Sequence, residues 1–202
     1  MKNNICVNMT NLNDNERATL LALIEKANKS KRLSEVCVGD TFKIADIEFV
    51  KLAEDNGMAI VVTKNILFQS EFDEQSSDFE TSILLRTLES ETLPLITSEI
   101  GDDNVVDFTT NLLSDDGLDD YGKMLSKISL PTLDMYRQYR RIFDQYKVTD
   151  WWWLATPYSA PTGGYTSSVR CVGSDGALGS NHCRGRLGIR PLCVFKSNIF
   201  VS

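Results

Sequence analysis

The spacing of apolar positions predicts a helix near the start of the chain. Apolar side chains recur at helical intervals over residues 12–31, and Asn13 or Asp14 can cap the first turn. The apolar face consists of Leu20, Leu21, Leu23 and Ile24. A short terminal helix of this kind either pairs with other subunits or packs on its own domain, and the sequence leaves both alternatives open.

Two further helices are predicted in the middle of the chain. Residues 78–90 have helical spacing, with Asp78 as the cap. Residues 131–146 form the clearest helix of the sequence, and Pro131 and Thr132 mark its start.

Strands are predicted on both sides of this helical middle. Residues 35–64 alternate apolar and polar side chains around Asn56-Gly57, which is the turn of a hairpin. The end of the chain carries three more strands and one turn, at residues 151–154, 168–172, 189–195 and 174–176. This order of elements indicates an α+β domain over residues 35–202, preceded by the helical segment of residues 1–34.

Length and charge restrict the class of protein. The 202 residues, 42% of them hydrophobic, suit one globular domain with a small appendage. The net charge of −7 argues against nucleic acid or an anionic membrane as the main partner, because both require a basic patch. No apolar run is long enough for a membrane span, and the first residues do not form a signal peptide, so we expect synthesis in the cytoplasm.

Two groups of residues could be considered as metal ligands, but neither matches the pattern of a known metal site. Within the acidic, irregular residues 101–122, the stretch 114–122 resembles a calcium loop only loosely, and a solvated turn is the better interpretation. Cys171, Cys183 and Cys193 lie close in sequence but lack the spacing of zinc ligands, which favours buried apolar thiols. We therefore expect no metal and no cofactor.

The composition of residues 154–195 is biased. This window contains no Lys, Glu, Gln, Met or Trp, whereas an even spread of their 34 occurrences would place about seven there. These five amino acids are the ones that a codon ending in a pyrimidine cannot encode. A loop region rich in Gly and Ser also disfavours long helix formers, but that explanation does not account for four arginines beside no lysine.

Three motifs carry a resemblance. The runs "WWWLATPYS", "VRCVGSDGAL" and "LGIRPLCVFKSNIFVS" resemble the end of C-type-lectin-fold proteins of the formylglycine-generating-enzyme-like subclass, among them the variable proteins of diversity-generating retroelements. The resemblance implies a short twisted antiparallel sheet, two or more helices and a large irregular loop region near the C-terminus. It also implies that adenine-directed mutation diversifies the window.

The resemblance divides residues 151–191 into two classes. The scaffold would consist of Trp151, Trp152, Trp153, Gly188, Arg190 and Pro191. The ligand-binding face would consist of Tyr158, Tyr165, Thr166, Ser167, Ser168, Arg170, Asp175, Ser180, Asn181, His182, Arg184 and Arg186. Residues 165–168, 170, 173, 175, 177 and 179–187 are expected to vary at little cost to folding.

The sequence thus predicts a non-enzymatic protein that binds a macromolecule, most simply a protein, on a diversified surface. A phage or mobile-element structural protein without a variable site is one alternative, and attachment to a virion fits either interpretation. A copper-dependent oxidase related to the formylglycine-generating group is a second alternative, because three cysteines lie near the C-terminus.

Overall fold

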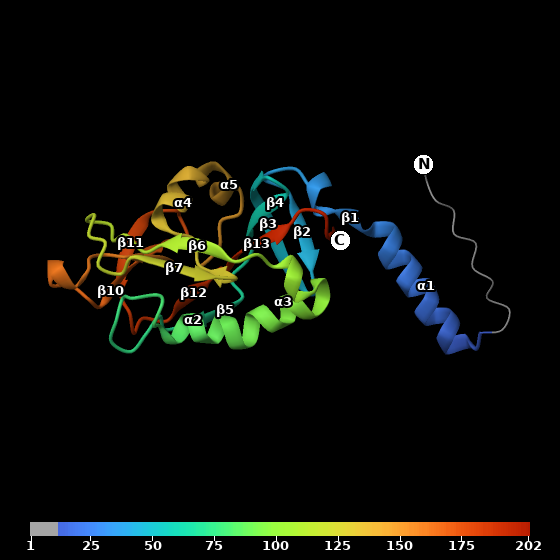
Figure 1. Ribbon diagram of the computed structural model, residues 1–202, viewed down its shortest axis with the longest axis horizontal. Coiled ribbons are helices and arrows are strands. Elements are labelled where there is room, and N and C mark those ends of the chain that lie inside the picture. The colour runs from blue at the N-terminus through green and yellow to red at the C-terminus, as the bar shows by residue number, and fades with distance from the viewer. Residues whose placement is uncertain (1–11) are drawn as a thin grey trace.

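The computed structural model describes residues 12–202, and of residues 22–29 only the backbone. Two five-stranded sheets lie side by side between two helical layers, and a long helix stands away from them at one end (Figure 1). The predicted α+β class is confirmed. No helix within residues 12–202 is long and apolar enough to cross a membrane.

The first sheet has the order β2-β3-β4-β13-β8 and is antiparallel at every pair. Asn56 and Gly57 both have positive φ in the tight turn between β3 and β4, as the predicted hairpin requires. Its strands are β2 (Thr41–Ile44), β3 (Ile47–Asp55), β4 (Met58–Thr63), β8 (Ile128–Ser129) and β13 (Leu192–Lys196).

The second sheet has the order β11-β10-β9-β12-β5, and only the pair of β9 and β12 is parallel among its neighbours. The strand predicted at residues 168–172 is confirmed as β10. Its strands are β5 (Phe68–Ser70), β9 (Trp152–Pro157), β10 (Ser168–Val172), β11 (Leu178–His182) and β12 (Leu187–Ile189).

Two small ribbons and four short turns of helix complete the fold. In one ribbon a strand from the start of the domain pairs with the last strand of the chain, and the other ribbon covers one side of the domain. These elements are β1 (Lys31–Arg32) with β14 (Phe200–Val201), β6 (Phe108–Asn111) with β7 (Lys123–Ser126), η1 (Leu33–Glu35), the π-helical η2 (Leu88–Thr92), η3 (Asp102–Asn104) and η4 (Pro161–Gly163).

One helical layer runs along one face of both sheets. It consists of α2 (Ile83–Thr87), η2 and α3 (Leu93–Ile100) in direct succession. Pro94 has no N–H for a helical hydrogen bond, which fits the π-helical turns just before it. The predicted start was wrong: Ser82 caps this helix, and Asp78 instead accepts hydrogen bonds within the preceding turn.

The other helical layer covers the opposite face. Thr132 caps it as predicted, but Tyr139 departs from helical geometry and divides the predicted helix into α4 (Leu133–Gln138) and α5 (Arg140–Gln145). Trp153 of β9 packs in the cluster under α2 and α3, whereas Trp152 packs in the cluster under α4 and α5. Adjacent residues of one strand therefore build both halves of the core.

The chain passes from one sheet to the other at Arg190 and Pro191. We expected one strand over residues 189–195, and the structure has two, β12 in the second sheet and β13 in the first. Pro191 cannot donate a ladder hydrogen bond, so the strand ends there. The Gly-x-Arg-Pro motif thus marks the junction between the sheets.

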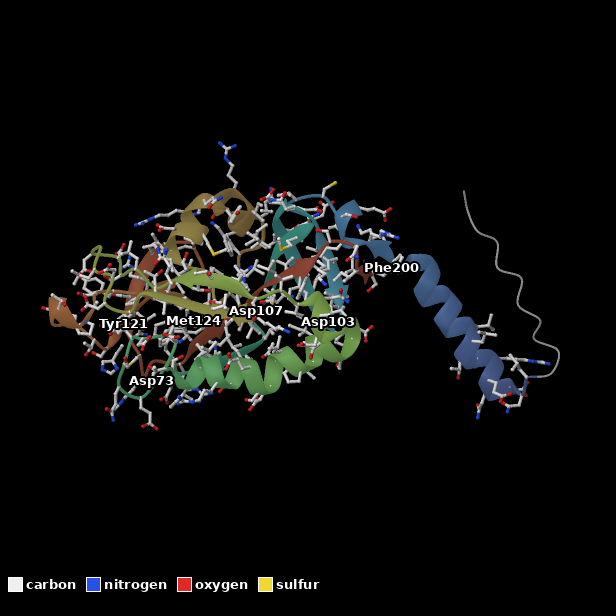
Figure 2. The ribbon with its side chains drawn as sticks, viewed as in Figure 1. Asp73, Asp103, Asp107, Tyr121, Met124 and Phe200 are labelled. Carbon is white, nitrogen blue, oxygen red and sulfur yellow. The ribbon has the colours of Figure 1, made fainter. Side chains whose placement is uncertain are left out.

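The N-terminal helix α1 (Asp14–Lys29) projects from the end of the domain that carries β1 and β14, where Phe200 is labelled (Figure 2). Leu20 is half-buried and Leu21 is 48% exposed, while the side chains of Leu23 and Ile24 lie outside the described residues. The predicted boundary after residue 34 falls too late, because Leu33 is buried and its carbonyl accepts a hydrogen bond from Lys51 Nζ.

Candidate binding surface

The residues predicted to bind a ligand gather at the end of the molecule opposite α1, with one exception (Figure 1). Backbone pairing places Ser168 opposite His182 and Arg170 opposite Ser180, and Cys183 N donates to Ser167 O at 2.7 Å. We call this surface the hairpin face; it comprises Tyr158, Tyr165, Thr166, Ser167, Ser168, Arg170, Ser180, Asn181, His182, Arg184 and Arg186.

The exception is Asp175. It lies in the turn that joins β10 to β11, and its Oδ1 accepts a hydrogen bond from Ala177 N at 2.8 Å. Lys147 after α5 donates to its carbonyl at 3.0 Å, so this turn sits beside α5, at the far end of the hairpin. Asp175 therefore shapes a turn and does not belong to the hairpin face.

Two tyrosines form the apolar part of the hairpin face. The rings of Tyr158 and Tyr165 meet edge to face with centroids 6.3 Å apart, and the side chains are 42% and 64% exposed. The Arg170 guanidinium lies 6.0 Å from the centre of the Tyr158 ring, and its Nε is 3.4 Å from Asp115 Oδ2. This arrangement presents an amphipathic aromatic surface next to a fixed cation.

The acidic loop of residues 114–122 holds the loop that bears these tyrosines. Ser159 Oγ donates to Asp116 Oδ2 at 2.5 Å, and Thr162 N donates to Asp120 Oδ2 at 2.7 Å. Hydrogen bonds from Ser114 and Ser159 lower the pKa of Asp116, and those from the Thr162 backbone and side chain lower the pKa of Asp120. The acidic loop, which we expected to be a solvated turn, therefore supports the hairpin face through these hydrogen bonds, and we call it the acidic brace.

A second loop, residues 71–81, supports the hairpin face from the other side. Phe72 N donates to Cys183 O at 2.8 Å, and Ser77 N donates to Thr166 O at 2.7 Å. Burial alone would raise the pKa of Asp73, but three backbone N–H donors, from Gln75, Ile83 and Ser76, hold it below its usual range. Figure 2 labels Asp73 at this end of the molecule.

The two arginines after β11 also contact the neighbouring backbone. Arg184 Nε donates to Glu74 O at 2.5 Å, and Arg186 Nη2 donates to Gln69 O at 3.2 Å. Both side chains are exposed, so their remaining N–H groups stay accessible to acidic groups of a partner. His182 Nδ1 accepts from Arg184 N at 3.2 Å, which orients the imidazole along the surface.

The predicted scaffold is buried, except for Trp151. Trp152, Trp153, Gly188, Arg190 and Pro191 are buried, whereas Trp151 is 41% exposed, and its ring covers Gly173 and Gly179 at the edge of the hairpin. Strand alternation directs the rings of Trp152 and Trp153 into the two core clusters, and Trp151 precedes β9.

Arg190 has a structural role, as expected. Its guanidinium lies 4.9 Å from the centre of the Trp152 ring and 5.3 Å from that of Phe143, and Nε donates to Thr63 O at 3.1 Å. Burial lowers its pKa to about 10. This side chain fixes the junction between the sheets.

The predicted tolerance to change fails at several positions. Cys183 is fully buried in the core, although it lies within the expected variable run 179–187. A Cβ added at Gly173 or Gly179 would come within 3.2 Å or 2.6 Å of Trp151 ring atoms. The framework therefore extends into the hairpin, and only its outward-facing residues are available for variation.

The three C-terminal cysteines are buried thiols, as we expected from their lack of zinc-ligand spacing. Burial raises the pKa of Cys171 to about 11, and it also raises the pKa of Cys193 and of Cys183. Thiolate, the form that binds metals and attacks substrates, is therefore disfavoured at all three positions. Within residues 12–202, no group of three or more His, Cys, Asp or Glu side chains is arranged to hold a metal ion.

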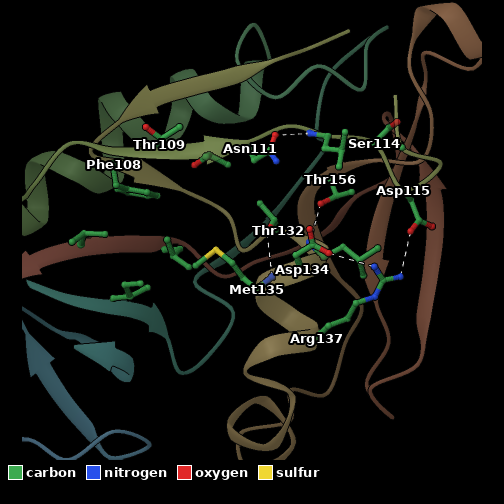
Figure 3. Close-up of a pocket in the computed structure, with 17 residues that line it drawn as sticks. Phe108, Thr109, Asn111, Ser114, Asp115, Thr132, Asp134, Met135, Arg137 and Thr156 are labelled. Carbon is green, nitrogen blue, oxygen red and sulfur yellow. Dashed lines mark hydrogen bonds and ion pairs between the residues drawn. The ribbon is translucent and has the colours of Figure 1, made fainter. Parts of the chain in front are cut away.

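A pocket of about 390 Å³ lies beside the hairpin face, and sequence reasoning missed it (Figure 3). We call it the side pocket. Its walls come from β6 and the following loop, the start of α4 and the strands β4, β9 and β13. Asp115 connects the two surfaces, because it lines the pocket and forms ion pairs with both Arg137 and Arg170.

Residues 68–197 match the model of a family described as Domain of unknown function (DUF6273). The match covers well over half of the chain. The chain belongs to the DUF6273 family. No curated protein and no solved structure matches it.

The DUF6273 match begins at the first residue of β5 and ends just after β13. It contains the whole second sheet, the hairpin face, both braces and both helical layers, but not β2, β3 or β4. Of the residues that line the side pocket, Ile60 alone lies outside the match. The family region therefore contains the whole hairpin face and nearly the whole side pocket.

No local signal in the sequence could have found the braces or the side pocket. Asp116 and Ser159 are 43 positions apart, and Asp120 and Thr162 are 42 positions apart. The pocket likewise combines side chains from five separate stretches of the chain. Only the run of carboxylates at residues 115–120 was visible, and its composition is equally typical of a solvated turn.

Proposed function

We propose that this protein binds a macromolecular ligand, a protein, on the hairpin face, and that it is not an enzyme. The observation that carries the proposal concerns residues 158–186, which contain most of the exposed positions of the biased window. Protein surfaces normally use Lys, Glu and Gln freely. This exposed segment of 29 residues contains none of them, while an even spread would give about five of the five missing types.

Burial cannot explain that absence. It does explain why β9 and β13 lack long polar side chains, because nearly all of their residues are buried. Residues 158–186 include three arginines and no lysine, although the two cations suit an exposed surface equally well. Restriction to codons ending in a pyrimidine accounts for this pattern, since Arg has such codons and Lys has none.

The chemistry of the hairpin face suits protein recognition. Tyr158 and Tyr165 provide rigid aromatic area, while Ser, Thr and Asn provide adaptable hydrogen bonds, as in antibody loops. Arg184 and Arg186 add cations that can pair with carboxylates of the partner. Three buried thiols with raised pKa values offer no activated nucleophile or metal ligand, so the oxidase alternative lacks support.

We further propose that the gene is diversified by a retroelement and that the domain has the C-type-lectin-like fold implied by its motifs. The gene neighbourhood tests the first part. A near-copy of the stretch encoding residues 154–195, differing from it only where the copy has adenine, should lie near a reverse transcriptase gene. A neighbourhood with phage structural genes and no such copy would favour the structural-protein alternative.

The opposite end of the molecule has a separate role in this proposal. Because α1 stands away from the domain and isolated helices of this length are marginal in water, we propose that it associates with α1 of other copies. Light scattering should give a multiple of the 22.7 kDa chain mass for the full chain. It should give a monomer when Leu20 and Leu21 are both replaced by Glu, with the melting curve of the domain unchanged.

A display library tests binding directly, although the natural ligand is unknown. The library would randomise six positions of the hairpin face with codons that end in a pyrimidine, namely Tyr158, Tyr165, Ser168, Ser180, Asn181 and Arg184. A matched library would randomise exposed positions at the other end, namely Lys43, Asp46, Met58, Lys196, Asn198 and Phe200. We expect most clones of both libraries to resist protease, and the hairpin library to yield at least about tenfold more binders to serum albumin.

The proposal fails if the hairpin library unfolds or yields no more binders than the matched library. Unfolding would mean that the exposed side chains carry the stability of the fold. Equal yields from folded libraries would mean that the hairpin face has no advantage as a binding surface.

A further inference from the structure

The side pocket borders the hairpin face and has no assigned role (Figure 3). Its volume of about 390 Å³ lies at the lower end of the range for sites that enclose a small organic group. Leu133 and Leu192 are buried at its base, and Phe108, Leu113 and Met135 are half-buried around it.

The hydroxyl groups in the interior of the pocket each already make a hydrogen bond within the protein, so a polar ligand gains little there. Thr110 Oγ1 donates to Ser129 Oγ at 2.9 Å, Thr156 Oγ1 accepts from Leu133 N at 2.8 Å, and Thr132 Oγ1 accepts from Met135 N at 3.2 Å. The group that gains most from entering is therefore apolar.

The rim of the pocket is charged. Arg137 lies between Asp115 Oδ1 at 3.4 Å and Asp134 Oδ1 at 3.5 Å, and the Asp134 side chain is 78% exposed. Such long, exposed ion pairs are weak, so an incoming cation can compete for the two carboxylates. The adjacent loop contributes further exposed carboxylates, Asp116, Asp119 and Asp120, which gives this side of the surface a net negative charge.

The pocket and the hairpin face form one continuous surface through Asp115, which contacts Arg137 on one side and Arg170 on the other. Most of the pocket lining precedes residue 154, and the three lining residues within the biased window, Thr156, Leu192 and Val194, are all buried. The pocket would therefore remain unchanged while the hairpin face varies.

We propose that the side pocket is a constant anchor site that receives an apolar side chain of the protein partner, flanked in the partner by Lys or Arg. This inference rests on the proposed function. The apolar side chain fills the pocket, and the neighbouring cations contact Asp115 and Asp134 on its rim. Recognition then combines a fixed anchor with a variable surround, as interfaces concentrate binding in a central buried contact.

Short blocked peptides test this with the full chain. The probes are acetyl-Lys-Lys-X-Lys-Lys-amide with Leu, Phe or Gly at X, and acetyl-Glu-Glu-Leu-Glu-Glu-amide. Methyl resonances of Leu133, Met135 and Leu192 report occupancy of the pocket by NMR titration. We expect the Leu and Phe peptides to bind at least about tenfold more tightly than the Gly peptide, and the acidic peptide to bind more weakly than its basic counterpart.

A blocking variant provides the control. Leu113→Trp should fill the pocket and abolish the methyl shifts, whereas Leu125→Trp, at a 69% exposed position on β7, should leave them unchanged. If Leu113→Trp does not fold, Leu113→Phe, a smaller increase in volume at the same position, replaces it. Asp134→Asn should weaken the basic peptides and leave a neutral acetyl-Ser-Ser-Leu-Ser-Ser-amide unaffected.

Three results would overturn the anchor site. These are equal affinity for the Leu and Gly peptides, methyl shifts that persist in the blocking variant, and shifts with cyclohexanol but with none of the peptides. The last result would indicate a pocket for a small molecule. The two proposals can fail separately. If the hairpin library fails but the peptides bind in the pocket, the hairpin face is rejected as a binding surface and the anchor site is retained.

Discussion

The biased window has two parts that differ in burial, although both lack Lys, Glu, Gln, Met and Trp. Residues 154–157 and 187–195 are buried strand and junction, apart from the half-buried Leu187, and they contribute to both core clusters. Residues 158–186 are mostly exposed, and β11 has no buried residue. Burial accounts for the absence of Lys, Glu and Gln in the first part but not at the exposed positions of the second.

This difference in burial indicates which residues stabilise the fold. The framework takes its stability from Trp152, Trp153 and the Arg190 junction, whereas the hairpin face is held by backbone pairing and by hydrogen bonds from two neighbouring loops. A surface supported in this way can change its outward side chains without losing its shape. The following substitutions test that separation.

The largest effect is expected at Trp152. Its ring is almost fully buried and contacts Tyr136, Phe143 and Arg190. Trp152→Ala should lower the free energy of unfolding by about 3–5 kcal/mol in urea melts. Trp151→Ala, at the exposed neighbour, should cost only about 1 kcal/mol. Equal costs at the two positions would contradict the division between framework and surface.

A smaller loss is expected at Gly188. A Cβ at this position would come within 2.4 Å and 2.6 Å of Ile66 side-chain atoms, so the Ile66 side chain must shift from its present packing. Gly188→Ala should lower the free energy of unfolding by about 1–3 kcal/mol in urea melts. Ser174→Ala, at an exposed turn position, serves as the control and should leave the melt unchanged.

A local effect is expected at the acidic brace. The pKa values of Asp116 and Asp120 are lowered in the folded protein, so their stabilisation is complete above the usual range of an aspartate and disappears as pH falls through the lowered values. Amide-exchange protection of Thr162, corrected for intrinsic rates, should therefore decrease below about pH 4.

Substitution should reproduce that loss at neutral pH. The double variant Asp116→Asn, Asp120→Asn should lower the protection of Thr162 at pH 7, while the global melt changes little. Asp119→Asn is the matched control in the same loop, because no hydrogen bond of its carboxylate supports residues 157–164. Unchanged protection in the double variant would show that the brace does not order the loop.

The local elements of the fold could largely be predicted from the sequence. The Asn56-Gly57 turn, β10, the Thr132 cap and the burial of Trp152 and Trp153 follow from turn chemistry, alternation and side-chain size. The break at Tyr139 could not be predicted with the same rules. At Pro191 the missing N–H is a local sign that a strand ends, but it does not show that the chain continues in the other sheet. That change depends on how β13 pairs with β4 and β8, which lie far away in the sequence.

The candidate site could be predicted as a list of residues but not as a surface. Exposure of Tyr158, Tyr165 and Asn181 agrees with the expected face, whereas Asp175, which the resemblance assigned to that face, lies in the turn at the far end of the hairpin. Cys183 shows the same limit. It was expected to be a buried thiol and also to lie within the variable run, and only the structure shows that its side chain belongs to the core while its carbonyl holds the neighbouring loop.

One measurement tests the separation of framework and hairpin face most directly. The variant combines five changes at exposed positions, namely Ser180→Asn, Asn181→Ser, His182→Asn, Arg184→Ser and Arg186→Ser. Urea melts should show one cooperative transition with an unchanged slope and a total loss of only about 1–2 kcal/mol, mostly from the two arginine hydrogen bonds. A loss as large as that of Trp152→Ala, or a transition that is no longer cooperative, would show that these residues belong to the core of the fold.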